Sequence, residues 1–137
     1  MKLTGPYLGQ KPPEMTPELF APGTVCTHMD DWAIRFSPDG NEIYFTVTGK
    51  NQAALVSIKF KKGKWIGPEV MSFSGNYFVY APAVSYDGTR LVFSSFRPLV
   101  PGEGKNDVDL WITYRIGDGW DVPIHISGIN TDDNNEV

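Results

Sequence analysis

Residues 34–46 read Ile-Arg-Phe-Ser-Pro-Asp-Gly-Asn-Glu-Ile-Tyr-Phe-Thr, and residues 82–94 read Pro-Ala-Val-Ser-Tyr-Asp-Gly-Thr-Arg-Leu-Val-Phe-Ser. The two stretches superpose when Asp39 is placed on Asp87, which gives an offset of 48 residues. In each stretch an apolar run ends at an Asp-Gly turn signal and is followed by a second run of β-branched and aromatic residues. Such a repeat is typical of stacked β-sheet units, for example propeller blades.

The repeat continues downstream, where Trp65 superposes on Trp120 at an offset of 55, so the second copy is seven residues longer. Runs of β-forming residues between turn signals predict four strands in each copy. The predicted strands are residues 32–37, 43–47, 54–60 and 65–70 in the first copy, and 80–86, 90–96, 108–115 and 120–124 in the second.

The pattern within each copy favours propeller blades over a sandwich. The second strands are apolar at successive positions, which indicates burial on both faces of a sheet. The fourth strands contain Pro68 and Pro123, and proline is tolerated at a sheet edge. We therefore expect an all-β fold of four-stranded antiparallel β-propeller blades in an incomplete ring, either a fragment or part of an oligomer.

The first copy also carries a family resemblance. Residues 36–45 read Phe-Ser-Pro-Asp-Gly-Asn-Glu-Ile-Tyr-Phe, which resembles the WD-like β-propeller repeat of TolB-type proteins, with a core of roughly F-S-P-D-G-x-x-I-x-F. The second copy departs from it, with Tyr86 at the proline and Leu-Val-Phe at residues 91–93. The resemblance covers about residues 28–137. It implies a closed ring of about six or more blades, mostly binding functions, and a periplasmic or extracellular location; the relatives also include lyases and the non-catalytic propellers of some peptidases.

The repeat divides the chain into four parts. Residues 1–27 form an extended, proline-rich arm that either supplies a closing strand to a ring or crosses one face as a leader. Residues 28–75 are the first blade and residues 76–128 the second. Residues 129–137 resemble the lead-in to a third blade.

Two blades are too few for a ring, since propellers close with ~4–8 blades. The chain is then a fragment, a unit that completes its ring with other copies, or a stand-alone two-sheet domain. If it is the whole protein, self-association is expected, because an open pair exposes more apolar surface than a monomer usually does.

Composition and the distribution of apolar residues argue against several classes of protein. A net charge of −4 argues against general nucleic-acid binding, which normally needs a basic stripe. No apolar run is long enough for a transmembrane helix, and the first residues lack the apolar core of a signal peptide. The single cysteine, Cys26, excludes an internal disulfide and suggests a buried, inert thiol.

The residues that enter each first strand are the candidate ligand-binding residues, because this part of a blade lies at the mouth of the central channel. The set is His28, Asp30 and Asp31 in the first copy, Tyr77 and Tyr80 in the second, and Glu136 in the third. Such a mouth suits a sugar, a peptide or a hard cation such as Ca²⁺. The alternative is that these carboxylates cap turns by bonding to backbone amides.

A second candidate region is the loop at residues 97–107, the main insertion between the copies, where Arg97 could contact a partner. Asp39 and Asp87 are interpreted as turn residues that bond to their own backbone. His125 is predicted on the solvent face of an edge strand or linker, without a catalytic role.

The sequence favours a binding function over an enzymatic one. It lacks a Gly-x-Ser-x-Gly nucleophile elbow, a Ser/His/Asp set and metal-ligand spacing, so no catalytic residue and no cofactor is predicted. The leading hypothesis is a non-catalytic propeller module that binds a protein or carbohydrate partner at the channel mouth or the insertion loop. The alternative is a glycan-acting lyase or hydrolase with a metal site, Ca²⁺ or Mn²⁺, or an acid/base site involving His28 and Asp31.

Overall fold

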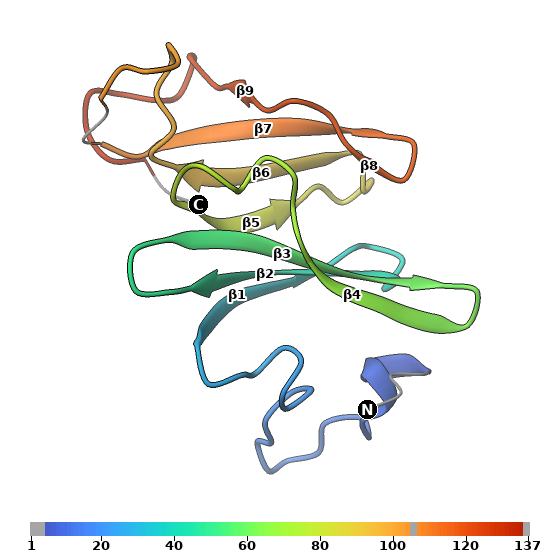
Figure 1. Ribbon diagram of the computed structural model, residues 1–137. Coiled ribbons are helices and arrows are strands. Elements are labelled where there is room, and N and C mark those ends of the chain that lie inside the picture. The colour runs from blue at the N-terminus through green and yellow to red at the C-terminus, as the bar shows by residue number, and fades with distance from the viewer. Residues whose placement is uncertain (1–4, 105–106, 136–137) are drawn as a thin grey trace.

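The computed structural model describes residues 5–104 and 107–135 as an all-β fold of two stacked antiparallel sheets (Figure 1). The first sheet contains β1 (Asp30–Phe36), β2 (Glu42–Thr48), β3 (Ala53–Lys61) and β4 (Lys64–Val70). The second contains β5 (Val79–Val84), β6 (Arg90–Ser95), β7 (Asp109–Ile116), β8 (Gly119–Trp120) and β9 (Ile124–His125). A short 3₁₀ turn, η1 (Pro6–Gly9), lies near the start of the arm.

Each sheet is a meander in which sequence neighbours pair, and the strand positions agree with those predicted from sequence. The fourth strand of the second sheet differs, because β8 and β9 are two short pieces that both pair with β7. Residues 121–123 separate them, and Thr113 Oγ1 donates a hydrogen bond to the Asp121 carbonyl at this break (2.7 Å). Pro123 lies at this break, but its equivalent Pro68 lies within the continuous strand β4, so the proline alone does not cause the interruption.

The two sheets repeat the same strand pairing, residue by residue. We call residues 30–70 the first repeat and residues 79–125 the second; equivalent residues differ by 48 in the first two strands and by 55 in the last two. Equivalent pairs are Trp32↔Thr46 and Tyr80↔Ser94, Thr46↔Leu55 and Ser94↔Leu110, and Phe60↔Trp65 and Arg115↔Trp120. Even the bulge in the first strand recurs, with Ala33 and its equivalent Ala81 both at positive φ (53° and 52°).

The Asp-Gly turns have the structural role that the sequence indicated. The hydroxyl of Ser37 donates to Asp39 Oδ1 at 2.6 Å, and the hydroxyl of Ser85 donates to Asp87 Oδ1 at 2.5 Å. In both turns the same carboxylate oxygen accepts a backbone N–H two residues later. The aspartates therefore close the hairpins, and the two turns lie in like settings.

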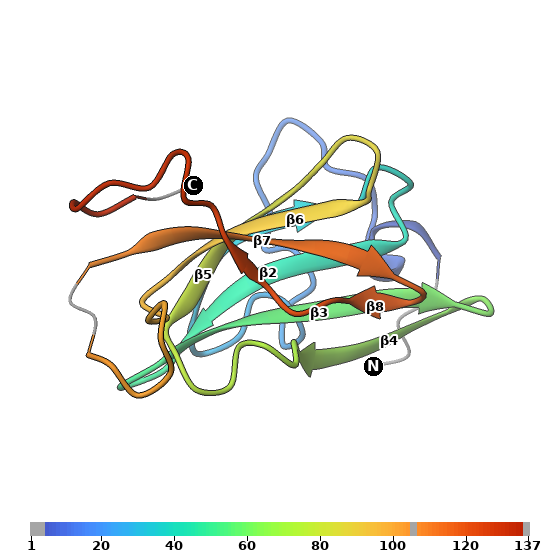
Figure 2. The ribbon, with the colours of Figure 1, turned by 90° about the horizontal axis from the view of Figure 1, so that it is seen from above.

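The core has two layers. One apolar cluster fills the space between the sheets, where Tyr44 and Leu55 of the first sheet meet Val79, Phe93 and other residues of the second. Seen from above, the second sheet lies over the first (Figure 2), and β5 is the strand that contacts β1, β2 and β3. Burial on both sides of β2 explains its continuous apolar run.

The other cluster lies between the first sheet and the arm, which runs along the far side of that sheet (Figure 1). Leu8 and Val25 of the arm pack with Phe45 and Ile58 there. The arm thus lies across one face of the sheet as a leader. Its described residues belong to neither sheet, so a closing strand stays a prediction.

Candidate functional site

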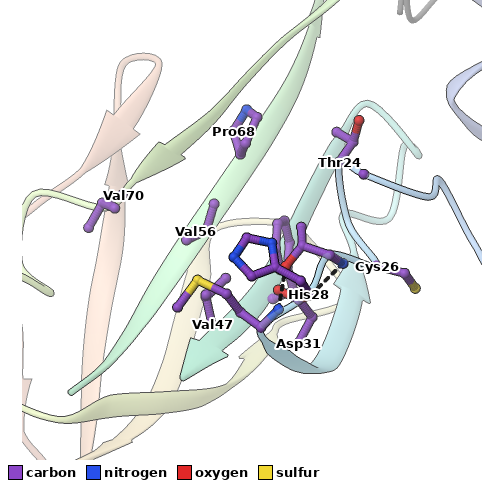
Figure 3. A pocket seen from close by; sticks show the side chains of 12 residues that line it. Thr24, Cys26, His28, Asp31, Val47, Val56, Pro68 and Val70 are labelled. Carbon is purple, nitrogen blue, oxygen red and sulfur yellow. Dashed lines mark hydrogen bonds between the residues drawn. The ribbon is translucent and has the colours of Figure 1, made fainter. Parts of the chain in front are cut away.

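A cavity of about 570 Å³ opens on the arm side of the first sheet (Figure 3). Its floor is apolar and is formed by Phe45, Val47, Val56, Pro68 and Val70, which come from β2, β3 and β4. Its rim is formed by residues between Gly23 and Asp31, where the arm ends and β1 begins. We call this cavity the arm pocket.

Backbone geometry on both sides fixes the shape of the arm pocket. On β4, Pro68 follows Gly67, where an added Cβ would lie 2.8 Å from the carbonyl oxygen of Ser57, so only glycine fits the close approach of β3 and β4. On the arm, the N–H of Val25 donates to the Ala21 carbonyl at 2.9 Å, and the Val25 side chain is fully buried. The rim is therefore anchored immediately before the candidate residues begin.

Asp31 is held in the rim by one of its two oxygens. Asp31 Oδ2 accepts hydrogen bonds from the N–H of Thr27 (2.6 Å) and from its hydroxyl (2.7 Å). The Thr27 hydroxyl in turn accepts the N–H of Met29 at 3.1 Å. Asp31 Oδ1 is buried and has no hydrogen-bond partner among the described residues. The Asp31 carboxylate therefore keeps unused capacity to accept a hydrogen bond beside the pocket.

His28 lies beside Asp31 in the rim, and its ring projects over the sheet in Figure 3. Asp30 is exposed, and it pairs with Thr48 at the edge of the sheet. The sulfur of Cys26 points away from the labelled wall residues in Figure 3. Within residues 5–104 and 107–135, no group of three or more His, Cys, Asp or Glu side chains is placed to hold a metal ion.

Arg97 and Tyr77 come together in the second repeat. The guanidinium of Arg97 stacks on the rings of Tyr77 (5.4 Å to the centroid) and Trp111 (5.3 Å), and it donates a hydrogen bond to the Phe73 carbonyl. Burial lowers the pKa of this guanidinium. Arg97 therefore packs against the second sheet at the start of the insertion loop, and its contact with a partner stays a prediction.

The remaining candidates lie elsewhere. Tyr80 packs on Trp32 of the first sheet, with ring centroids 5.6 Å apart. Glu136 lies outside the described residues. Of the predicted set, His28 and Asp31 thus share the arm pocket, and Tyr77 and Arg97 share a contact in the second repeat.

Sequence reasoning missed a charged network between the two sheets. Glu42 Oε2 and Oε1 accept hydrogen bonds from the guanidinium of Arg115 at 2.5 and 3.2 Å. The same guanidinium lies 4.0 Å from the ring centroid of Trp120 and 3.2 Å from the hydroxyl of Tyr44. Lys59 Nζ lies 3.7 Å from Glu42 Oε1. The sequence signal was a pair of opposite charges within otherwise apolar strands.

The network lowers the pKa of Glu42 and raises the pKa of Tyr44. Burial alone would raise the pKa of the Glu42 carboxyl, but hydrogen bonds from Arg115 and Tyr44 and nearby positive charge hold that pKa below its ordinary value. Burial and the hydrogen bond to Glu42 raise the pKa of the Tyr44 hydroxyl. Glu42 is therefore ionised in the folded protein at neutral pH, and it ties the first repeat to the second.

The prediction for His125 was wrong about its surroundings. Its Nε2 lies 2.8 Å from Asp109 Oδ2 and 2.8 Å from the side-chain nitrogen of Asn130, and its ring packs edge-on against Trp111 at 5.3 Å. The side chain is largely buried, because the residues after β9 fold back along β7. The backbone N–H and carbonyl of Leu110 both bond to Asn130, which completes this fold-back.

No family model matches the chain, and searches of curated proteins and of solved structures gave no match. In the described part of the chain, no helix has the length and apolar character needed to cross a membrane.

Proposed function

We propose that this chain is a non-catalytic binding module that holds a segment of a protein partner in the arm pocket. The observation that carries this proposal is the pocket itself, with an apolar floor of valine, proline and phenylalanine and a polar rim. Small-molecule and peptide sites commonly combine apolar walls with a few placed polar groups. A protein partner is favoured over a carbohydrate because the floor is mostly aliphatic, without a stacking platform of exposed aromatic rings.

We also propose that the two repeats are consecutive blades of a TolB-type, WD-like β-propeller. Support comes from the identical strand pairing of the repeats and from the F-S-P-D-G turn of the first one. Tyr44 and Leu55 of the first sheet pack against the second sheet. Their equivalents in the second repeat, Val92 and Leu110, lie on the outer face of the second sheet. A further repeat, or a second copy of the chain, is expected on this face.

Selection of random displayed peptides on the intact chain tests the binding function. We expect enriched peptides whose binding is lost when Val70, an exposed floor residue at the edge of the sheet, is replaced by tryptophan. Leu99→Trp is the matched control, since Leu99 is equally exposed and belongs to the insertion loop. Enriched peptides that bind Val70→Trp as tightly as the unmodified chain would contradict the proposal.

A further inference from the structure

The arm pocket exists because the first repeat departs from the second at equivalent positions. In the second repeat the equivalent surface is filled by Trp111, with Arg97 stacked on one side and His125 packed against it. Their equivalents in the first repeat are Val56, Gly49 and Val70. The indole, the guanidinium and the imidazole are thus replaced by two valines and a glycine, and open space remains over β2 and β3.

A fourth departure places charge beside this space. The equivalent of Asp31 is Val79, a fully buried member of the apolar cluster between the sheets. The first repeat therefore carries a carboxylate at a position that the second repeat fills with an apolar core side chain. One of its oxygens, Oδ1, is buried without a partner. A buried acceptor without a partner is unfavourable, so a donor brought to this carboxylate would stabilise the complex.

From these departures we infer that the arm pocket binds an arginine side chain of a partner polypeptide. The inference rests on the proposed function and names the chemistry of the partner. The guanidinium pairs with the Asp31 carboxylate, and the methylene stem lies on Val47, Val56 and Val70. Charge complementarity supports this occupant, since the pocket lining contains the Asp31 carboxylate and no lysine or arginine.

Arginine fits this site better than other residues for three reasons. Its stem is apolar and its planar head is weakly hydrated, so it loses less on entering an apolar pocket than the lysine ammonium does. Some of its N–H donors can serve the Asp31 carboxylate while others remain directed to the open rim. In the second repeat the same part of the sheet already packs a guanidinium, that of Arg97.

Titration of the intact chain with blocked pentapeptides of sequence Gly-Ser-X-Ser-Gly tests the inference. The central residue is arginine, citrulline, lysine or leucine, affinity is measured by calorimetry, and the bound site is located from methyl shifts of Val47, Val56 and Val70. We expect the arginine peptide to shift these methyls and to bind about tenfold or more tightly than the citrulline peptide, because citrulline has the same shape without the charge.

Three variants sharpen the test. Asp31→Asn keeps an oxygen for Thr27 and should bring the arginine peptide to the affinity of the citrulline peptide. Val56→Trp restores the residue of the second repeat and should abolish the methyl shifts. Asp30→Asn removes a neighbouring exposed charge that does not line the pocket, and it should change affinity by less than about twofold.

The outcomes separate this inference from the proposed function. If the leucine or citrulline peptide binds in the pocket as tightly as the arginine peptide, the inference is wrong while the binding function stands. If no peptide shifts the pocket methyls, both are wrong. The comparison of peptides on the unmodified chain decides the matter even if a variant fails to fold.

Discussion

The clamp between the repeats, Glu42 with Arg115, gives the most quantitative prediction. Arg115→Met removes two charge-assisted hydrogen bonds to Glu42, at 2.5 and 3.2 Å, and the stacking of the guanidinium on Trp120. Breaking a fully buried ion pair costs about 3–5 kcal/mol. The two side chains are 23% and 16% exposed, and Lys59 still faces Glu42, so we expect a loss of about 2 kcal/mol in the free energy of unfolding.

Urea denaturation followed by tryptophan fluorescence measures this loss, and a double-mutant cycle with Glu42→Gln isolates the pair. We expect a coupling energy of about 1–2 kcal/mol. Arg90→Met is the control, because the pair of Arg90 with Asp87 is half exposed and contributes little. If Arg115→Met destabilises the chain no more than Arg90→Met does, the clamp does not hold the repeats together.

The clamp also has a pH signature. The pKa of Glu42 is lower in the folded state than its ordinary value of 4.5, so the unfolded chain binds this proton first as pH falls. The stabilisation from ionised Glu42 is complete above about pH 4.5, and it is lost as the pH falls through the lower pKa that Glu42 has in the folded state. The stability difference between the unmodified chain and Glu42→Gln should therefore narrow below pH 4.5. A difference that stays constant there would contradict the assigned shift.

Three further predictions concern the arm, the turns and the outer face. Trp65→Phe removes the indole donor to the Gly5 carbonyl (2.9 Å), so the arm should be cleaved by protease about fivefold faster; an unchanged rate would show that this contact does not anchor it. Asp39→Ala loses the carboxylate that accepts from Ser37 and should lower the free energy of unfolding by about 1 kcal/mol in urea melts, whereas no change would exclude a turn-closing role. Sedimentation should show mass rising with concentration, and Tyr114→Glu on the exposed outer face should suppress it; a monomer at all concentrations would contradict self-association.

Local signals in the sequence were sufficient for the strands and turns. The Asp-Gly turns at Asp39 and Asp87 and the β-branched runs beside them depend on residues close in the chain, and the structure confirms their positions. The exception is the split of the fourth strand into β8 and β9. Pro123 lies at the split, but Pro68 occupies the equivalent position in the continuous strand β4, so the proline did not predict the break. The hydrogen bond from the Thr113 hydroxyl to the Asp121 carbonyl at the break depends on tertiary geometry.

Contacts between residues that are distant in the sequence could not be predicted from the local sequence pattern. Glu42 and Arg115 lie in different repeats, and their pairing depends on how the two sheets stack. His125 is buried because the chain after it folds back onto β7, which the apolar pattern around it did not indicate. Part of the arm pocket was predicted, because His28 and Asp31 were candidate binding residues. Its floor was not predicted, because it depends on small side chains such as Val56, and their effect is recognised only by comparison with larger residues at equivalent positions of the second repeat.

The stacking of the two repeats positions the clamp and the apolar cluster between the sheets, and a methyl-resolved NOE spectrum of the intact chain tests it most directly. We expect cross-peaks from the Val79 methyls of the second sheet to Leu55 and to the ring of Tyr44 in the first, because all three belong to one buried cluster. A spectrum in which Val79 shows contacts only within its own sheet would contradict it.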